Sequence, residues 1–319
     1  MDRFSESDTS KLRAAAQIIA DGGIVAIPTE TVYGLAANAL DAEAVRKIFI
    51  AKGRPFIDPL ICHVSDFAAL EEIALPNDSA RKLAEKFSPG PITFVLPKRA
   101  NVPDIVSAGL PTVAVRIPRH PLMREFLKLV SVPLSAPSAN PFGYVSPTRA
   151  EHVQAQLGDK IDMILDGGQC DCGVESTIIM LVDEEHPMLL RPGPISRVQI
   201  EEVLGRSVED PKDKNPAHPD APGMLKSHYS PKSTLSLFEG NAPRTQDAAV
   251  IFFQRPDSPT ENEFWLSESG EAAEAAHNLF DLLRKLDGKF SQIFCEKLPA
   301  DGIGEAVNDR LLRASNSGA

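Results

Sequence analysis

The sequence predicts an α/β protein, in which a twisted mixed sheet with helices on both sides is followed by a smaller α/β domain. Short apolar runs typical of buried strands alternate with amphipathic helical stretches, without the regular spacing of a purely parallel sheet. Residues 206–233 then change in character, with five prolines among charged and small residues. The 319 residues are enough for one large domain and one smaller domain.

The first domain is expected to span residues 1–205. Apolar positions at helical spacing, capping residues such as Asp41 and Ser196, and terminating prolines or glycines predict its helices. Short apolar runs between turn residues predict its strands. The expected helices are residues 7–20, 41–51, 66–74, 78–87, 121–130, 148–157 and 196–204. The expected strands are residues 24–27, 60–64, 92–96, 113–117, 132–135, 161–165, 176–182 and 188–190, with 101–111 as a loop.

Residues 206–233 are expected to form a long linker, and residues 234–319 the second α/β domain. Apolar runs predict strands at 235–238, 250–253 and 292–295, and helical periodicity predicts helices at 270–286 and 305–313. The linker contains Ser227-His228-Tyr229-Ser230, and a pure tether rarely needs adjacent imidazole and phenol groups. This segment is therefore a candidate to reach back and cover a site in the first domain.

Composition and charge exclude several classes of protein. The net charge is −11, with 20 basic and 26 acidic residues in 1–205 and 13 and 18 in 206–319, so neither part is a basic nucleic-acid module. No run of eighteen apolar residues occurs, and the polar N-terminus is no signal peptide, so we expect a cytoplasmic protein with no membrane partner. The four cysteines do not form a disulfide framework, and Cys170-Asp171-Cys172 lacks a second pair of metal ligands, so no metal site is predicted.

Residues 28–64 have the features of an anion-binding site. Pro28-Thr29-Glu30-Thr31 ends the strand 24–27, and ligands of open α/β sheets bind beyond such strand ends. The next helix leads into Lys52-Gly53-Arg54-Pro55, and His63 lies on the following strand. Each part alone has a structural explanation, because a lysine at a helix C-terminus interacts favourably with the helix dipole and a threonine can cap a turn. No G-x-x-x-x-G-K-[ST] loop appears, so any nucleotide would be bound by side-chain cations and small-residue loops.

The motifs in this region resemble those of the L-threonylcarbamoyladenylate synthase family, the YrdC-like proteins of tRNA modification. The matching stretches are PTETVYGL (28–35), AKGRP (51–55), PLICHV (59–64), SPGPITFVL (88–96), TVAVRIP (112–118), SAPSAN (135–140), GVESTII (173–179) and LLRPG (189–193). APGMLKSHYSP (221–231) resembles the joint to the extra domain of the long family form. The resemblance implies a YrdC-like first domain and a Rossmann-like second domain, recognised by position.

The resemblance also implies a reaction. L-threonine, bicarbonate and ATP, the last a substrate and not a retained cofactor, would give threonylcarbamoyladenylate and pyrophosphate. The product would pass to a tRNA threonylcarbamoyltransferase complex, and weak RNA binding would fit that role. An N-carboxylated threonine must attack the α-phosphorus, which requires cations on the polyphosphate and exclusion of water.

The family's functional residues map onto this chain one by one. The resemblance implies that Lys52 and Arg54 are catalytic cations that also hold the triphosphate. For the L-threonine pocket it implies Thr31, His63, Arg116, Ala136 and Ser176. For the ATP side it implies Thr112, Ser138, Asn140, Ser146, Arg191 and Tyr229. A guanidinium such as Arg116 suits a carboxylate because it donates two parallel hydrogen bonds.

Two positions depart from the family pattern. Gly53 replaces a larger residue between the two cations, and Asp58 stands where a neutral residue is expected. We place Asp58 on the ATP side, where it either helps to hold the Mg²⁺ that accompanies ATP or points away. No residue stands out as a general base, and positioning with charge neutralisation is sufficient for such chemistry.

Two other classes of protein remain as alternatives. The first is a double-stranded RNA-binding protein of the same fold without synthase activity, against which the acidic charge argues. The second is a carbamoyl-transfer maturation enzyme that shares this domain, but acylphosphatase-like and zinc-binding segments are not found in the sequence.

Overall fold

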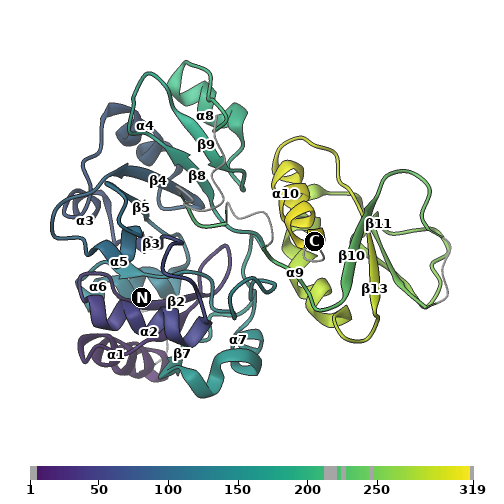
Figure 1. Cartoon of the computed structure of the whole chain (residues 1–319), viewed down its shortest axis with the longest axis horizontal. Coiled ribbons are helices and arrows are strands. Elements are labelled where there is room, and N and C mark those ends of the chain that lie inside the picture. Colours follow the sequence, from purple (N-terminus) through teal and green to yellow (C-terminus); the bar gives the residue numbers. More distant parts are fainter. Residues whose placement is uncertain (1–5, 212–220, 224–227, 244–246, 317–319) are drawn as a thin grey trace.

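A computed structural model describes residues 6–211, 221–223, 228–243 and 247–316. A larger and a smaller α/β part lie side by side along the long axis of the molecule (Figure 1). Of the stretch expected to be a linker, residues 212–220 and 224–227 lie outside the described residues, and these include Ser227. The remaining residues of that stretch, including His228 and Tyr229, are described.

The larger part is built on a twisted mixed sheet, as the sequence predicts. Among the described residues the sheet has nine strands in the order β7-β1-β2-β6-β3-β5-β4-β8-β9. They are β1 (Val25–Ile27), β2 (Gly34–Asn38), β3 (Ile61–His63), β4 (Ile92–Pro97), β5 (Thr112–Arg116), β6 (Leu134–Ser135), β7 (Met163–Ile164), β8 (Thr177–Met180) and β9 (Met188–Arg191). The parallel pairing of β3 with β5 places His63 opposite Arg116. Two polar side chains predicted for the site are therefore neighbours at the end of adjacent strands.

Helices cover both faces of this sheet. They are α1 (Glu6–Ala20), α2 (Ala42–Lys52), α3 (Phe67–Glu71), α4 (Asp78–Phe87), α5 (Asp104–Ser107), α6 (Pro121–Val130), α7 (Ala150–Leu157) and α8 (Arg197–Leu204). Successive residues of β1 point to opposite faces, since Val25 and Ile27 pack with α1 and α6, whereas Ala26 packs with α2 and α7. Asp41 caps α2 by accepting from two backbone N–H groups, so the cap predicted from the sequence is correct. The helix ends before Gly53, whose φ of 63° favours glycine.

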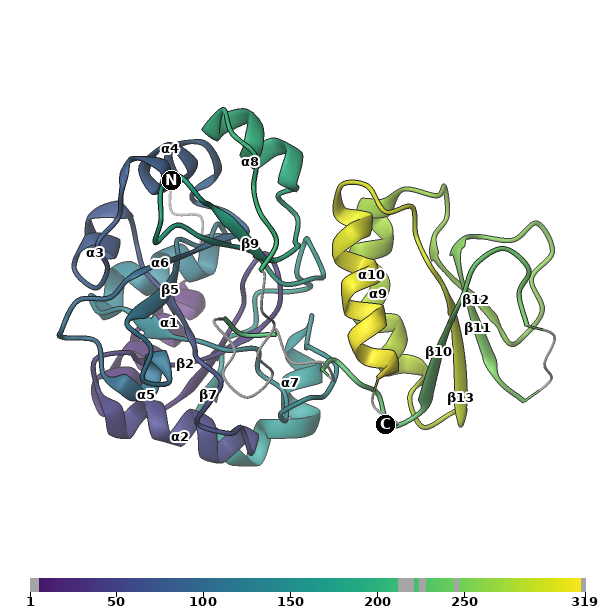
Figure 2. The same cartoon turned by 45° about the horizontal axis from the view of Figure 1, so that its top comes forward.

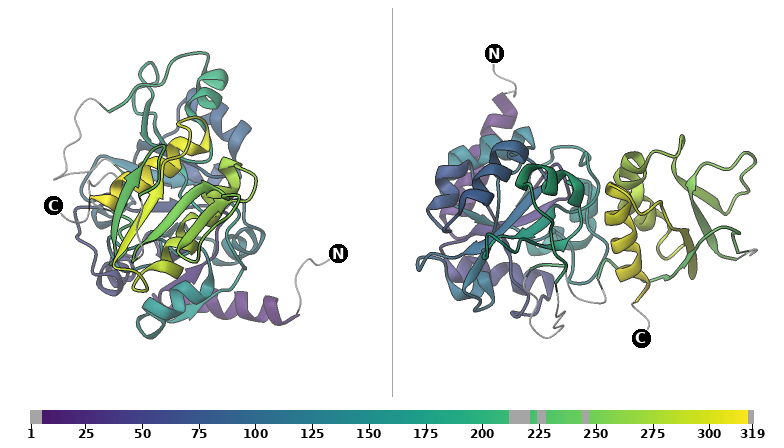
Figure 3. Two further views of the ribbon diagram at one scale, coloured as in Figure 1. Left: turned by 90° about the vertical axis from the view of Figure 1, so that its right-hand side faces the viewer. Right: turned by 90° about the horizontal axis from the view of Figure 1, so that it is seen from above.

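The smaller part has a parallel sheet in the order β10-β13-β11-β12. Its elements are β10 (Thr234–Phe238), β11 (Ala249–Gln254), β12 (Glu263–Ser267), α9 (Ala272–Leu286), β13 (Gln292–Glu296) and α10 (Ile303–Ser315). Both helices lie between this sheet and the larger part (Figures 2 and 3). The core of the smaller part also includes Val32, Val145 and Val174 from the larger part. The two parts thus share apolar packing.

Some elements differ from the prediction. β2 was not expected, because its sequence GLAAN has neither alternation nor β-branched residues, and it forms by pairing with β1 and β6. β12 was also missed, and the expected loop 101–111 contains the short helix α5. Thr148 was expected to cap α7, but the residue at the cap position is Arg149. No helix among the described residues is both long enough and apolar enough to cross a membrane.

Candidate active site

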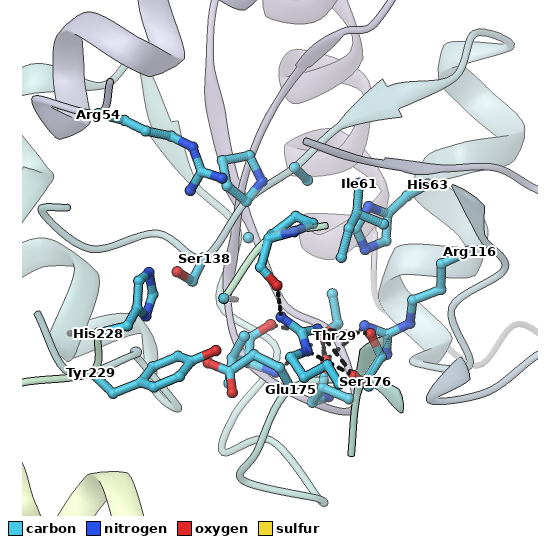
Figure 4. Close-up of a pocket in the computed structure, with 18 residues that line it drawn as sticks. Thr29, Arg54, Ile61, His63, Arg116, Ser138, Glu175, Ser176, His228 and Tyr229 are labelled. Carbon is cyan, nitrogen blue, oxygen red and sulfur yellow. Dashed lines mark hydrogen bonds between the residues drawn. The ribbon is translucent and has the colours of Figure 1, made fainter. Parts of the chain in front are cut away.

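A pocket lies where the ends of β3 and β5 meet the loops that follow β1 and β6 and the loop that precedes β8. Figure 4 shows two ends, with His63 and Arg116 at one and Arg54, His228 and Tyr229 at the other. The lining residues are Thr29, Thr31, Val32, Gly34, Arg54, Ile61, His63, Arg116, Ala136, Pro137, Ser138, Glu175, Ser176, Arg191, Pro222, Gly223, His228 and Tyr229. Nine of the fourteen residues predicted for the site are in this set.

Arg116 organises the first end of the pocket. Its Nη1 donates to Thr31 Oγ1 at 2.8 Å, and its Nη2 lies 2.8 Å from Glu30 Oε1. Its Nε donates to the carbonyl of Gly90 at 3.3 Å. Burial would raise the pKa of Glu30, but the charge and hydrogen bond of Arg116 outweigh burial and lower it. Glu30 is therefore an anion that orients the guanidinium.

His63 completes this end as a neutral group. It is buried, and burial together with the nearby charge of Arg116 lowers its pKa to about 3. Its Nδ1 has no hydrogen-bond partner among the described residues. An unpartnered buried nitrogen is costly to leave unsatisfied, so a polar ligand at this end would gain a hydrogen bond.

Arg54 lies at the second end and is already paired within the protein. Its Nη2 is 2.9 Å from Asp58 Oδ2 and donates to the carbonyl of Pro59 at 2.8 Å. Burial raises the pKa of Asp58 against the opposing charges of Arg54 and Lys52. Asp58 is fully buried and does not line the pocket, so it lies behind Arg54.

Lys52 also lies behind the pocket wall. Its Nζ donates to the carbonyls of Ser138 and Asn140, each at 2.5 Å. Burial, and next the charge of Arg54, lowers the pKa of Lys52 well below its ordinary value. In this arrangement Lys52 holds the loop that carries Ser138 against the pocket.

Arg191 joins three segments of the pocket wall. Its Nε and Nη2 donate to the carbonyl of Ser176 at 3.1 and 3.0 Å, and its Nη1 donates to the carbonyl of Pro222 at 3.1 Å. Gly223 follows with φ of 80°, and a Cβ there would come within 2.5 Å of the Tyr229 hydroxyl. This position therefore requires glycine if the tyrosine is to reach the pocket.

Tyr229 is held in an unusual conformation. Its φ of 64° is in the left-handed region that non-glycine residues rarely adopt. Its ring stacks on Phe280 of α9 with centroids 5.7 Å apart, and Arg310 of α10 lies 5.4 Å from the ring centroid. Burial raises the pKa of the hydroxyl, which is therefore a neutral hydrogen-bond donor.

The other predicted residues that do not line the pocket are Thr112, Asn140 and Ser146. Thr112 begins β5, four residues before Arg116. Asn140 braces its own loop by donating to the carbonyls of Pro141 and Tyr144.

Ser146 lies just behind the pocket wall, and Glu175 forms part of that wall. The Ser146 hydroxyl donates to Glu175 Oε1 at 2.5 Å. Sequence reasoning assigned Glu30 and Glu175 no role of their own, and it singled out His228 only as part of the segment expected to cover the site; His228 and Tyr229 do line the pocket. Glu30, Glu175 and His228 all lie inside stretches that resemble the family, and their place in those stretches was the only sequence feature that could have indicated a role in the site.

Comparisons with known proteins agree over almost the whole chain. A family model described as telomere recombination matches residues 17–193, and one described as threonylcarbamoyl-AMP synthase, C-terminal domain, matches residues 195–316. The chain is 41% identical to threonylcarbamoyl-AMP synthase of Pyrococcus abyssi, over 96% of this chain and 94% of that protein. It is 39% identical to the Bacillus subtilis protein of the same name, over 98% and 95%.

Solved structures agree with this result. The crystal structure of P. abyssi Sua5 complexed with L-threonine matches with a TM-score of 0.89 and 39% identity, covering 98% of this chain and 96% of that one. Full-length HypF matches with a TM-score of 0.50 and 20% identity, covering 56% of this chain and 28% of that one, which is a likeness of fold alone.

Proposed function

The chain belongs to the YrdC-like family of threonylcarbamoyl-AMP synthases, and we propose that it makes L-threonylcarbamoyladenylate and pyrophosphate from L-threonine, bicarbonate and ATP. The product would serve the threonylcarbamoyladenosine modification of tRNA. The reaction transfers an adenylyl group, so the enzyme is a nucleotidyltransferase. We place the enzyme in the cytoplasm, because the reaction needs ATP and serves tRNA.

One observation carries this proposal: the pocket has two chemically different cationic ends. At one end Arg116, Thr31 and the neutral His63 offer donors in a buried setting, as an amino acid with a carboxylate and a hydroxyl requires. At the other end Arg54 and Arg191 offer positive charge beside the neutral hydroxyl of Tyr229, as a nucleotide polyphosphate requires.

At the first end we assign Arg116 to the threonine carboxylate. Glu30 fixes the guanidinium from behind, so its orientation does not have to be established on binding. Thr31, Ser176 and the backbone at Ala136 complete the proposed threonine site. Burial at this end would also protect the threonine N-carboxylate, which loses CO₂ in water.

At the second end we assign Arg54, Arg191 and, through the loop it holds, Lys52 to ATP. The positive charge of Arg54 and Arg191 would stabilise the charge that develops as pyrophosphate leaves the α-phosphorus. Ser138 and Tyr229 line the same end, and Ser146 and Asn140 would support it from behind. For Thr112 the assignment to ATP rests on the family resemblance.

We propose Mg²⁺ as the companion of ATP, bound to the phosphates. Asp58 does not fit as its ligand, because its carboxylate is buried against Arg54. The described residues include no group of three or more His, Cys, Asp or Glu side chains that could hold a metal ion. A tRNA threonylcarbamoyltransferase complex is the proposed recipient of the product.

Both alternative classes receive less support. An RNA-binding surface needs exposed cations, whereas Lys52, Arg54, Arg116 and Arg191 are buried. A carbamoyl-transfer maturation enzyme would bring acylphosphatase-like or zinc-binding segments, which are not found in the sequence.

The test is pyrophosphate release measured with ATP, L-threonine and bicarbonate together and with each omitted in turn. We expect release only when all three are present. ATP consumption that does not depend on L-threonine would contradict the proposal. Salt-sensitive RNA binding without pyrophosphate release would contradict it as well.

A further inference from the structure

Arg310 of α10 is a fully buried arginine that crosses from the smaller part to the pocket wall. Its Nε donates to Glu175 Oε2 at 2.8 Å, and its Nη2 donates to the carbonyl of Glu175 at 3.4 Å. Its Nη1 donates to Asp309 Oδ2 at 2.9 Å. Burial would lower the pKa of Arg310, but Tyr229, Glu175 and Asp309 together raise it, so the group is a permanent cation.

The partners of Arg310 belong to the second end of the pocket. Glu175 lines the pocket and accepts from Ser146 through its other oxygen, Oε1. The guanidinium also lies 5.4 Å from the centroid of the Tyr229 ring, within the range of a cation–π contact. One side chain of the smaller part therefore holds both an acidic wall residue and the aromatic ring that faces the nucleotide end.

A second arginine of the smaller part acts on the same loop. Arg284 of α9 donates to the carbonyl of Ser146 at 3.1 Å, and it also donates to the carbonyl of Val145. The hydroxyl of Ser146 is thus fixed through Glu175 and Arg310, and its backbone through Arg284. By contrast, Arg116 is held by Thr31, Glu30 and Gly90, which all belong to the larger part.

We propose that Arg310 is a positioning residue for the nucleotide end of the pocket, acting through Glu175 and Tyr229. The inference rests on the proposed function, because the ligand at that end is taken to be ATP. It gives the smaller part a specific role: its helices keep the ATP end in binding geometry, whereas Arg116 at the L-threonine end is held by residues of the larger part.

The alternative is that the Arg310–Glu175 pair only stabilises the contact between the two parts. The two roles make different predictions. A stabilising pair affects the amount of folded protein, and the remaining folded enzyme keeps the KM values of the wild type for both substrates. A positioning residue changes the kinetics for ATP and leaves those for L-threonine unaltered.

The experiment compares Arg310→Met, Arg310→Lys, Glu175→Gln and the double variant Arg310→Met/Glu175→Gln with the wild type. Leu312→Ala is the matched control, because Leu312 lies on the same helix and is 55% exposed. Thermal unfolding, kcat, and KM for ATP and for L-threonine are measured by pyrophosphate release for each protein. For Arg310→Met we expect kcat/KM for ATP to fall roughly tenfold to a hundredfold, the scale of a small misplacement of a binding group.

KM for L-threonine should stay within about twofold, and Arg310→Lys should recover part of the ATP loss because it keeps the charge. Since the pair acts as a unit, the double variant should be no worse than the poorer single variant. If Arg310→Met does not fold, Arg310→Lys and Glu175→Gln decide the matter by the same split between ATP and L-threonine.

Equal changes in KM for ATP and for L-threonine would overturn the inference but leave the proposed function standing. Folded variants that behave like Leu312→Ala would have the same consequence. The same holds if the losses of the single variants multiply in the double variant. A wild type that releases no L-threonine-dependent pyrophosphate overturns the proposed function, and the inference with it.

Discussion

Arg116→Lys tests the proposed L-threonine end while keeping the charge. Arg116 makes three contacts, to Thr31 Oγ1, Glu30 Oε1 and the carbonyl of Gly90. A lysine ammonium has the charge but not the planar fork, so it cannot reproduce this set and also hold a carboxylate with two parallel hydrogen bonds. The substitution should therefore weaken L-threonine binding more than ATP binding.

The magnitude follows from the lost hydrogen bond. One charge-assisted hydrogen bond to the substrate carboxylate contributes about 1.5–3 kcal/mol. At 1.4 kcal/mol per factor of ten, KM for L-threonine should rise roughly tenfold to a hundredfold. KM for ATP should change by less than about threefold, because Arg54 lies at the other end of the pocket.

The assay is pyrophosphate release with one substrate varied while the other two are kept saturating. Arg119→Lys is the matched control, since this arginine follows three residues later and its side chain is 54% exposed. Thermal unfolding of both variants separates a kinetic effect from loss of the fold. Equal increases in KM for ATP and L-threonine, with the fold intact, would refute the assignment of Arg116 to the threonine carboxylate.

Three further predictions follow from the same site. Asp58→Asn removes the negative charge behind Arg54, so KM for ATP should fall roughly tenfold to twentyfold. This corresponds to about 1.7 kcal/mol for one unit charge at an assumed separation of about 10 Å and an effective dielectric of about 20. An unchanged KM would argue that Arg54 does not face the phosphates. Because Arg116 lowers the pKa of Glu30 below its ordinary value of 4.5, the wild type should lose stability as the pH falls through that lowered pKa, and Glu30→Gln should lose less in a urea titration repeated from pH 6 to pH 3. An equal acid dependence in both proteins would show that the ion pair does not contribute. Thr112 begins β5 about 13 Å along the strand from Arg116, so Thr112→Val should leave KM for ATP within twofold, and a tenfold rise would support the role implied by the family resemblance.

The sequence predicted the parts of the site that depend on strand ends. Thr31 follows the first strand and His63 ends the third, and both positions are visible as polar residues after apolar runs. The parallel register that places His63 opposite Arg116 brings these side chains together. Local patterns were sufficient because each side chain is positioned by its own strand.

Local patterns were not sufficient where a charged side chain has its partner elsewhere. Lys52 was expected to face phosphate, but its ammonium group holds the carbonyls of Ser138 and Asn140, more than eighty residues away. For Asp58 the sequence left two possibilities, holding Mg²⁺ or pointing away from ATP. Its carboxylate lies against Arg54 inside the protein and does not line the pocket. The choice of partner depends on tertiary packing, which periodicity and capping rules do not contain.

Arg310 shows the same limit at the level of domains. In the sequence it is one of two basic residues in the second half of an amphipathic helix, and the pattern does not mark it as buried. The structure instead buries it completely and pairs it with Glu175, 135 residues earlier in the chain. An isolated buried cation is very unfavourable, so the pairing requires the two parts to pack together. A domain boundary at residue 205 therefore separates the helices and strands of the two parts. It also cuts across the contact between Arg310 and Glu175, which reaches the pocket wall.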